Sequence, residues 1–251
     1  MKSLLRAALV LGSMLLLSAP LRAANPDKLW EIVHQECVPG ALGGNNPAPC
    51  HLVDTQRGFV VLKDIVGVAQ FLLLPTARIS GIESPELLNE DAPNFWAFAW
   101  EQRYRVGEML GKPLAREQIG IEVNSAAARS QLQLHLHIDC LRADFPEALR
   151  SHEADTPEQW QPLMLDEHRY WVMRLVGSNL EGRNPFKLAA AMSPYARRAM
   201  GAQSLLLTGA RFSDGSEGFY LINSPVNFDK GERGSAEVWL DHGCGQSTAG
   251  K

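Results

Sequence analysis

Residues 130–140 read Ser-Gln-Leu-Gln-Leu-His-Leu-His-Ile-Asp-Cys, with apolar and polar residues in strict alternation. Alternation with a period of two is typical of a β-strand that packs one face on a core and leaves the other face free. We therefore expect a strand in which His135 and His137 point to the same side, in line with Gln133 and Asp139. Two imidazoles held side by side on a rigid element are well placed for catalysis.

The composition predicts an acidic globular body. The chain has 251 residues, of which 45% are hydrophobic, enough for one substantial core. Its formal charge is −4, and residues 1–24 hold three basic and no acidic side chains, so the rest of the chain carries about −7. An acidic body argues against non-specific nucleic-acid binding, which depends on basic surface.

The N-terminus resembles an export signal. Lys2 and Arg6 precede an uncharged run over residues 7–21, and a Leu-Arg-Ala-Ala site follows. The run is shorter than the roughly 20 apolar residues that span a bilayer, which favours a cleaved signal peptide. With the leucines before Arg6 it also suits an uncleaved anchor. We expect residues 1–24 to be a signal peptide or a single-pass inner-membrane anchor. The body, residues 25–251, is then periplasmic.

Four cysteines suit this compartment. Cys37, Cys50, Cys140 and Cys244 form an even set, and exported proteins normally oxidise such sets to disulfides. Four cysteines allow three pairings. A turn-rich loop over residues 39–49 favours Cys37–Cys50, which leaves Cys140–Cys244.

The body reads as an α+β fold built on an antiparallel sheet, because helices are interspersed with short, turn-linked strands. We expect strands at residues 58–62, 70–74, 119–123, 130–140, 170–176, 204–208, 218–222 and 236–240. We expect helices after Asn25-Pro26 and at residues 94–110, 145–152 and 184–200. The sequence holds no glycine-rich phosphate loop, GxSxG elbow or HExxH motif, so P-loop enzymes, α/β-hydrolases and zincins are disfavoured.

The run Phe-Trp-Ala-Phe-Ala-Trp at residues 95–100 has two interpretations. A helix that is apolar nearly all round is normally buried, which favours core packing. Exposure of Trp96 and Trp100 would instead indicate a lipid-contacting surface.

The histidine strand and its approach resemble the histidine-triad (HIT) superfamily. The residues that carry the resemblance are Asn124, Ser130 and the alternating Gln133-Leu-His135-Leu-His137. The resemblance implies a HIT-like sheet in which His135 is the nucleophile and His137 is the third histidine of the motif. Gln133 takes the place of the first histidine. Since that position is not the nucleophile, we expect activity to survive this departure from the motif.

Further segments resemble the bacterial CDP-diacylglycerol pyrophosphatase family within that superfamily. They are Glu36-Cys37, Pro49-Cys50, Gly58 to Asp64, Glu83-Ser84-Pro85, Pro93-Asn94-Phe95 and Cys140 after the histidine strand. The resemblance makes Asp64 a ribose ligand and Lys63 and Arg78 candidates for neutralising phosphate charge. It covers residues 36–140 well and the C-terminal half only loosely, through His242 and Cys244. We expect residues 25–140 to form the core of one domain and residues 141–251 to elaborate it.

The resemblance implies a phosphoanhydride hydrolase that converts CDP-diacylglycerol and water to CMP and phosphatidate through a nucleotidyl-His135 intermediate. Phosphate oxygens would be held by His137, Gln133, Ser130 and Asn124. The scheme requires no metal or other cofactor. The expected partners are the lipid-linked nucleotide, a membrane surface and a second copy of the chain in a homodimer.

Two alternative functions remain. A HIT-type hydrolase of a soluble nucleotide diphosphate conjugate would use the same histidines. A non-enzymatic periplasmic metal-binding protein would use His135, His137 and Asp139 as an H-x-H-x-D face, or the two histidines with Cys140.

Overall fold

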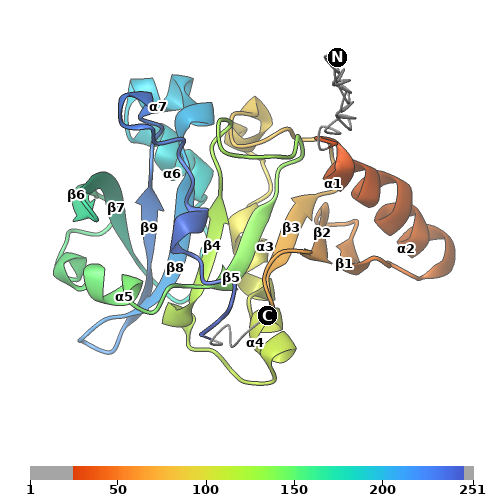
Figure 1. Cartoon of the computed structure of the whole chain (residues 1–251), viewed down its shortest axis with the longest axis horizontal. Helices are drawn as coiled ribbons and strands as arrows, with labels where there is room; N and C mark the ends of the chain where they lie inside the picture. Colours follow the sequence, from red (N-terminus) through yellow and green to blue (C-terminus); the bar gives the residue numbers. More distant parts are fainter. Residues whose placement is uncertain (1–24, 246–251) are drawn as a thin grey trace, which may run out of the picture.

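Nine strands form one sheet in the order β1-β2-β3-β5-β4-β8-β9-β7-β6 (Figure 1). The computed structural model describes residues 25–245, so the predicted signal peptide or anchor at 1–24 lies outside the described residues. All neighbouring strands are antiparallel. Because helices pack on this sheet, the predicted α+β class is confirmed.

The two parts of the chain share the sheet. The N-terminal strands are β1 (Cys50–Asp54), β2 (Phe59–Lys63), β3 (Phe71–Pro75), β4 (Ile119–Val123) and β5 (Leu136–Cys140). The later strands are β6 (Trp160–Leu165), β7 (His168–Val176), β8 (Leu205–Arg211) and β9 (Glu217–Asn223). Pairing of β4 with β8 joins the two sets into one continuous sheet.

Helical segments lie between and before these strands. The N-terminal helix consists of α1 (Lys28–Glu31), a π-helical stretch η1 (Ile32–Cys37) and α2 (Val38–Gly44). The others are α3 (Phe95–Gln102), α4 (Tyr104–Leu110), α5 (Phe145–Ala148), α6 (Pro185–Ala191) and α7 (Pro194–Arg198). Short 3₁₀ turns are η2 (Pro85–Leu88), η3 (Arg116–Gln118), η4 (Arg150–His152), η5 (Met200–Ala202), η6 (Phe228–Lys230) and η7 (Glu237–Trp239).

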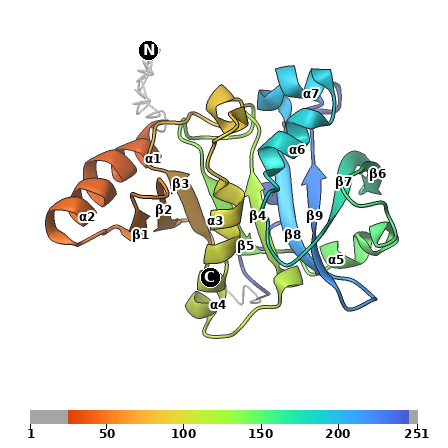
Figure 2. The ribbon, with the colours of Figure 1, turned by 180° about the vertical axis from the view of Figure 1, so that it is seen from behind.

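One face of the sheet carries the main core beneath α3 and α6 (Figure 2). Leu136 and Ile138 of β5 and Ile121 of β4 point into it. Trp96 and Trp100 of α3 are buried there too, so the aromatic run is core, as its all-round apolar character favoured. Within residues 25–245 no helix combines the length and the apolar character needed to cross a bilayer.

The other face is covered only towards its two ends. The N-terminal helix packs on β1 to β3 through a small cluster that includes Val33 and Leu72. At the far end, α5 and η7 pack on β8 and β9, where Phe145 and Trp239 are buried. Between these covers lie β5 and β4, whose alternate residues on this face are polar. The period-two pattern therefore leaves a polar strip in the middle of an otherwise apolar sheet.

The structure corrects three strand and loop predictions. β5 begins at Leu136, not at Ser130, because the backbone N–H groups of Leu132 and Leu134 bond to the carbonyls of Pro26 and Ile79 instead of to a strand. Residues 236–240 contain the 3₁₀ turn η7 (Glu237–Trp239) and not a strand, and a single bridge joins Leu240 to Leu141, the residue after β5. Strands β1 and β6 were not predicted from the sequence.

Both predicted disulfides are present. Cys37 bonds to Cys50, and Cys140 bonds to Cys244. The sequence analysis predicted that the Cys37–Cys50 bond closes a turn-rich loop. Residues 38–44 instead continue the helix before the chain turns back to β1.

Removing the Cys140–Cys244 bond is expected to cost the fold more than removing the other. It joins residues 104 apart, against 13 for Cys37–Cys50. In the chain-entropy picture these losses are about 4–5 and about 3 kcal/mol of unfolding free energy. Urea unfolding of the two double serine variants measures both values. An equal or smaller loss for Cys140→Ser/Cys244→Ser would show that loop length does not govern the effect.

Candidate active site

A cavity of about 380 Å³ opens on the polar strip, between the N-terminal helix, the β2–β3 loop and the β4–β5 loop. Its walls are Lys28, Leu29, Ile32, Leu62, Lys63, Asp64, Ile65, Val66, Leu72, Asn124, Ala128, Arg129, Ser130, Gln131, His135, His137 and Glu237. Six of the eight predicted catalytic and substrate-binding residues are therefore on one cavity. The exceptions are Gln133 and Arg78.

His135 is fixed in one tautomer and is buried beside the cavity. Its Nδ1 lies 2.6 Å from the carbonyl oxygen of Gln133. A carbonyl only accepts, so Nδ1 carries the hydrogen and Nε2 keeps its lone pair. Burial lowers the pKa of the imidazole below its usual value, which keeps the ring neutral. This is the protonation state of a nucleophile.

Gln133 positions the chain ahead of the histidine. Its side-chain amide donates to the carbonyls of Pro75 and Ala77, at 3.0 and 2.9 Å. Both amide hydrogens are used, so the geometry does not support the prediction that Gln133 donates to a phosphate. The glutamine instead ties the segment before β5 to the end of β3 and so places His135.

His137 faces a buried glutamate that the sequence analysis did not single out. Glu122 is its register partner across β4 and β5, and Glu122 Oε1 lies 3.4 Å from His137 Nε2. Burial raises the pKa of Glu122 well above its usual value, helped by nearby Glu237. Burial also holds the pKa of His137 well below its usual value, and the neighbouring His135 lowers it further. The dissociable proton of the pair therefore rests on Glu122 in the free protein.

Asn124 completes this group at the end of β4. Its Nδ2 donates to Glu122 Oε1 at 3.2 Å, and its own Oδ1 is buried with no partner among the described residues. The sequence did carry a signal: Ile-Gly-Ile-Glu-Val puts one acid in an apolar strand, two residues before Asn124. Burying a carboxyl in an apolar strand is costly, so an acid such as Glu122 at this position indicates a functional role.

A guanidinium also reaches the site without having been predicted. Arg129 binds both carboxylate oxygens of Glu83, with Nη2 to Oε1 at 2.7 Å, and lies on the cavity wall. A Cβ at Gly81 would stand 1.8 Å from Arg129 Nη1. Glycine at position 81 therefore makes the room in which the guanidinium is held.

The other predicted residues, Lys63, Asp64 and Arg78, already have hydrogen-bond or ion-pair partners in the fold. Lys63 donates to the carbonyls of Asp64 and Gly67, and the carboxylate of Asp64 accepts from Gln70 Nε2 at 2.6 Å, so both also hold the β2–β3 loop. Arg78 lies away from the cavity and is paired with Asp27 at 2.5 Å, half exposed. The structure therefore does not bring Arg78 to the site.

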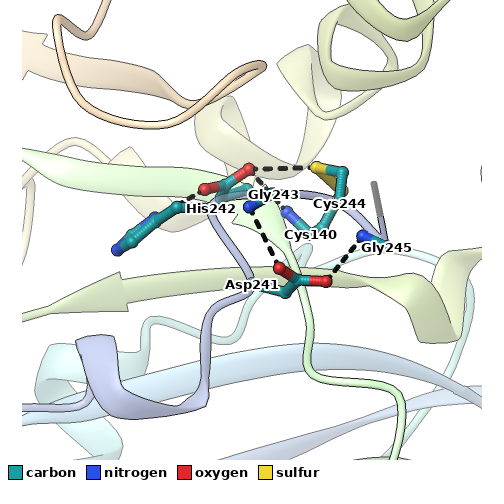
Figure 3. The surroundings of a disulfide bond; sticks show 7 residues. Cys140, Asp241, His242, Gly243, Cys244 and Gly245 are labelled. Carbon is teal, nitrogen blue, oxygen red and sulfur yellow. Dashed lines mark hydrogen bonds and ion pairs between the residues drawn. A yellow bond between two sulfur atoms is a disulfide. The ribbon is translucent and has the colours of Figure 1, made fainter. Parts of the chain in front are cut away.

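Asp139 belongs to a different group from the two histidines. Its carboxylate accepts from the Cys140 backbone N–H and pairs with His242 Nδ1 at 2.9 Å. His242 lies beside the Cys140–Cys244 disulfide (Figure 3). Within residues 25–245, Asp139 forms the one close set of three potential metal ligands with those two cysteines, and a disulfide occupies both sulfurs. His135, His137 and Asp139 do not meet as the metal-binding alternative requires.

The sheet brings a neutral imidazole and a buried glutamate–histidine pair to one cavity, an arrangement suited to an enzyme. The chain belongs to the CDP-diacylglycerol pyrophosphatase family, whose model matches residues 24–248. It is 42% identical over 226 residues to the CDP-diacylglycerol pyrophosphatase of Yersinia pestis, covering 89% of this chain and 86% of that protein. A HIT family hydrolase from Clostridium thermocellum aligns over 41% of this chain and 89% of its own, with 21% identity and a TM-score of 0.30.

Proposed function

We propose that the protein hydrolyses the phosphoanhydride of CDP-diacylglycerol to CMP and phosphatidate. Membership of the pyrophosphatase family and the name of the Yersinia pestis relative support the substrate. The observation that carries the chemistry is His135, buried on the cavity with Nδ1 committed to a carbonyl and Nε2 available.

In the proposed reaction, His135 Nε2 attacks the cytidylyl phosphorus and forms a P–N bond. The bond from that phosphorus to the bridging oxygen breaks, and the oxygen leaves on phosphatidate with the electron pair. A phosphate leaving group is stable as an anion and needs little acid assistance. Water then attacks the same phosphorus, the P–N bond breaks with its electrons returning to Nε2, and CMP is released with the water proton passed to solvent.

The cavity supplies donors for the phosphate oxygens. We assign this role to His137, Asn124 and Ser130, with Lys63 and Arg129 contributing positive charge. Asp64, on the same wall, is the proposed ribose ligand. The scheme routes no step through a metal or other cofactor.

We further propose that residues 1–24 export the body to the periplasm and, if uncleaved, hold it at the inner membrane. Homodimerisation remains a proposal, to be tested by light scattering. The export proposal rests on the sequence of residues 1–24, and the dimer proposal rests on the resemblance to HIT proteins.

The test is CMP release from CDP-diacylglycerol in detergent micelles, compared with release from water-soluble CDP-glycerol, each with and without EDTA. Rapid, EDTA-resistant release from the lipid supports the proposal. Release only from CDP-glycerol would favour the soluble-nucleotide alternative, and release that needs added metal would contradict the scheme.

A further inference from the structure

The β2–β3 loop carries an apolar tip at the mouth of the cavity. Ile65 is 100% exposed, and Val66 and Val68 are each 46% exposed. Ile65 and Val66 are also part of the cavity wall. Three neighbouring aliphatic side chains in water are unfavourable for a protein that has nothing to bind there, and exposed apolar groups at the rim of a site mark a contact surface.

Hydrogen bonds hold the loop in one conformation, so the apolar side chains at its tip are exposed on an ordered segment. The backbone N–H of Asp64 bonds to the carbonyl of Gln70, and the N–H of Val68 bonds to the carbonyl of His242, at 3.0 and 2.9 Å. Gly67 makes the turn with φ +71°, where a Cβ would stand 3.1 Å from Gln70 Cβ.

The cavity lining combines polar and aliphatic side chains. It includes His135, His137 and Asn124 as well as Leu29, Ile32, Leu62 and Leu72. Lys28 and Lys63 belong to the same lining. A substrate with an anionic headgroup and an aliphatic tail matches a lining of this mixed character.

The described chain begins at the same cavity. The carbonyl of Asn25 accepts from Gln131, a cavity residue, at 3.1 Å, and α1 starts at Lys28 on the cavity wall. The chain N-terminal to Asn25 is therefore attached near Gln131, on the wall of this cavity. The uncharged run of residues 7–21 lies in that part.

We propose that the apolar tip, Ile65, Val66 and Val68, inserts into a phospholipid bilayer and receives the acyl chains of the substrate as its headgroup enters the cavity. This inference rests on the proposed function, whose lipid substrate it gives a route. Burial of one aliphatic side chain in the acyl region corresponds to roughly a tenfold gain in binding.

The test compares full-length wild type with Val68→Asp, at the tip residue that is not part of the cavity wall, and with Met164→Asp. Met164 is a matched control: it is 60% exposed, lies on β6 at the other edge of the sheet and is remote from the cavity. CMP release is measured from CDP-diacylglycerol in phosphatidylethanolamine–phosphatidylglycerol vesicles and from its monomeric dihexanoyl analogue. Equal melting temperatures establish that all three proteins are folded.

For Val68→Asp we expect kcat/KM on vesicles to fall about tenfold, with a loss of less than about threefold on the monomeric substrate. Met164→Asp stays at the wild-type values. Equal losses on both substrates, or none on vesicles, would overturn the inference. If wild type releases no CMP from either, the proposed function fails, and flotation with substrate-free vesicles still decides the inference. Flotation uses proteins from which residues 1–24 have been removed and whose folding is checked by thermal unfolding: wild type and Met164→Asp must float and Val68→Asp must not.

Discussion

His135→Asn is expected to reduce CMP release by at least about 10⁴-fold, because asparagine offers a hydrogen-bonding group but no nucleophilic ring nitrogen. The side chain fills similar space near the carbonyl of Gln133, so the fold is retained. Steady-state release from CDP-diacylglycerol, with thermal unfolding as the folding check, measures the effect. His51→Asn, at an exposed histidine on β1, is the matched control and keeps full activity.

The covalent step gives a second readout for the same residue. In a rapid-quench experiment with substrate labelled at the cytidylyl phosphorus, wild type carries acid-labile label on the protein, and His135→Asn carries none. Because the pKa of His135 is lowered, the ring stays neutral as the pH falls past the usual histidine value, and activity is lost only at lower pH. Turnover above about 1% of wild type in the asparagine variant would remove His135 as the nucleophile.

The sequence predicted what depends on local pattern. The strict alternation of residues 130–140 gave the correct faces for β5, since Leu136 and Ile138 lie in the core and His137 on the opposite side. The helix prediction at 94–110 was confirmed apart from a break at Arg103, and Gly111 ends it with φ +67°. Cysteine count and export predicted both disulfides.

What depends on contacts between distant segments was not predictable in the same way. The segment before β5 reads as strand, but its backbone bonds to Pro26 and Ile79, which no local pattern reveals. Residues 236–240, Ala-Glu-Val-Trp-Leu, read as a strand because they are mostly apolar, yet the 3₁₀ turn there buries Trp239 against Phe145. Glu122 and Arg129 belong to the site because the fold brings Glu122 of β4 against His137 and binds Arg129 of the β4–β5 loop to Glu83. These contacts join distant segments and leave no local pattern.

Glu122→Gln is expected to lower kcat about 10²-fold at pH 7.5 while leaving substrate binding largely intact. Glu122 acts through His137, so it is a positioning and proton-holding residue. In the free protein the shared proton rests on Glu122, and an incoming diphosphate favours an imidazolium at His137. Transfer over the 3.4 Å between Oε1 and Nε2 then charges His137 without changing the net charge of the site.

The pH profile separates this role from a structural one. Glutamine keeps the shape and a donor but carries no transferable proton, so His137, whose pKa is lowered, must take its proton from solvent. The variant therefore regains activity as the pH falls below neutrality, whereas wild type is active at neutral pH and declines as Glu122 ionises at higher pH. Glu108→Gln, at an exposed position on α4, is the control and keeps the wild-type profile. A loss of equal size at every pH would contradict proton transfer.

Stability gives the same pair an independent signature. The pKa of Glu122 is raised on folding, so its protonated form favours the fold below pH 4.5, and this contribution is lost as the pH rises toward the folded-state pKa. Glu122→Gln does not titrate, so its unfolding free energy relative to wild type should rise with pH above 4.5, by up to about 1.4 kcal/mol per unit. Urea unfolding between pH 4.5 and 8 measures this slope. A flat difference would mean that Glu122 is ionised in the fold, and the proton would then have to reside on His137 before substrate binds.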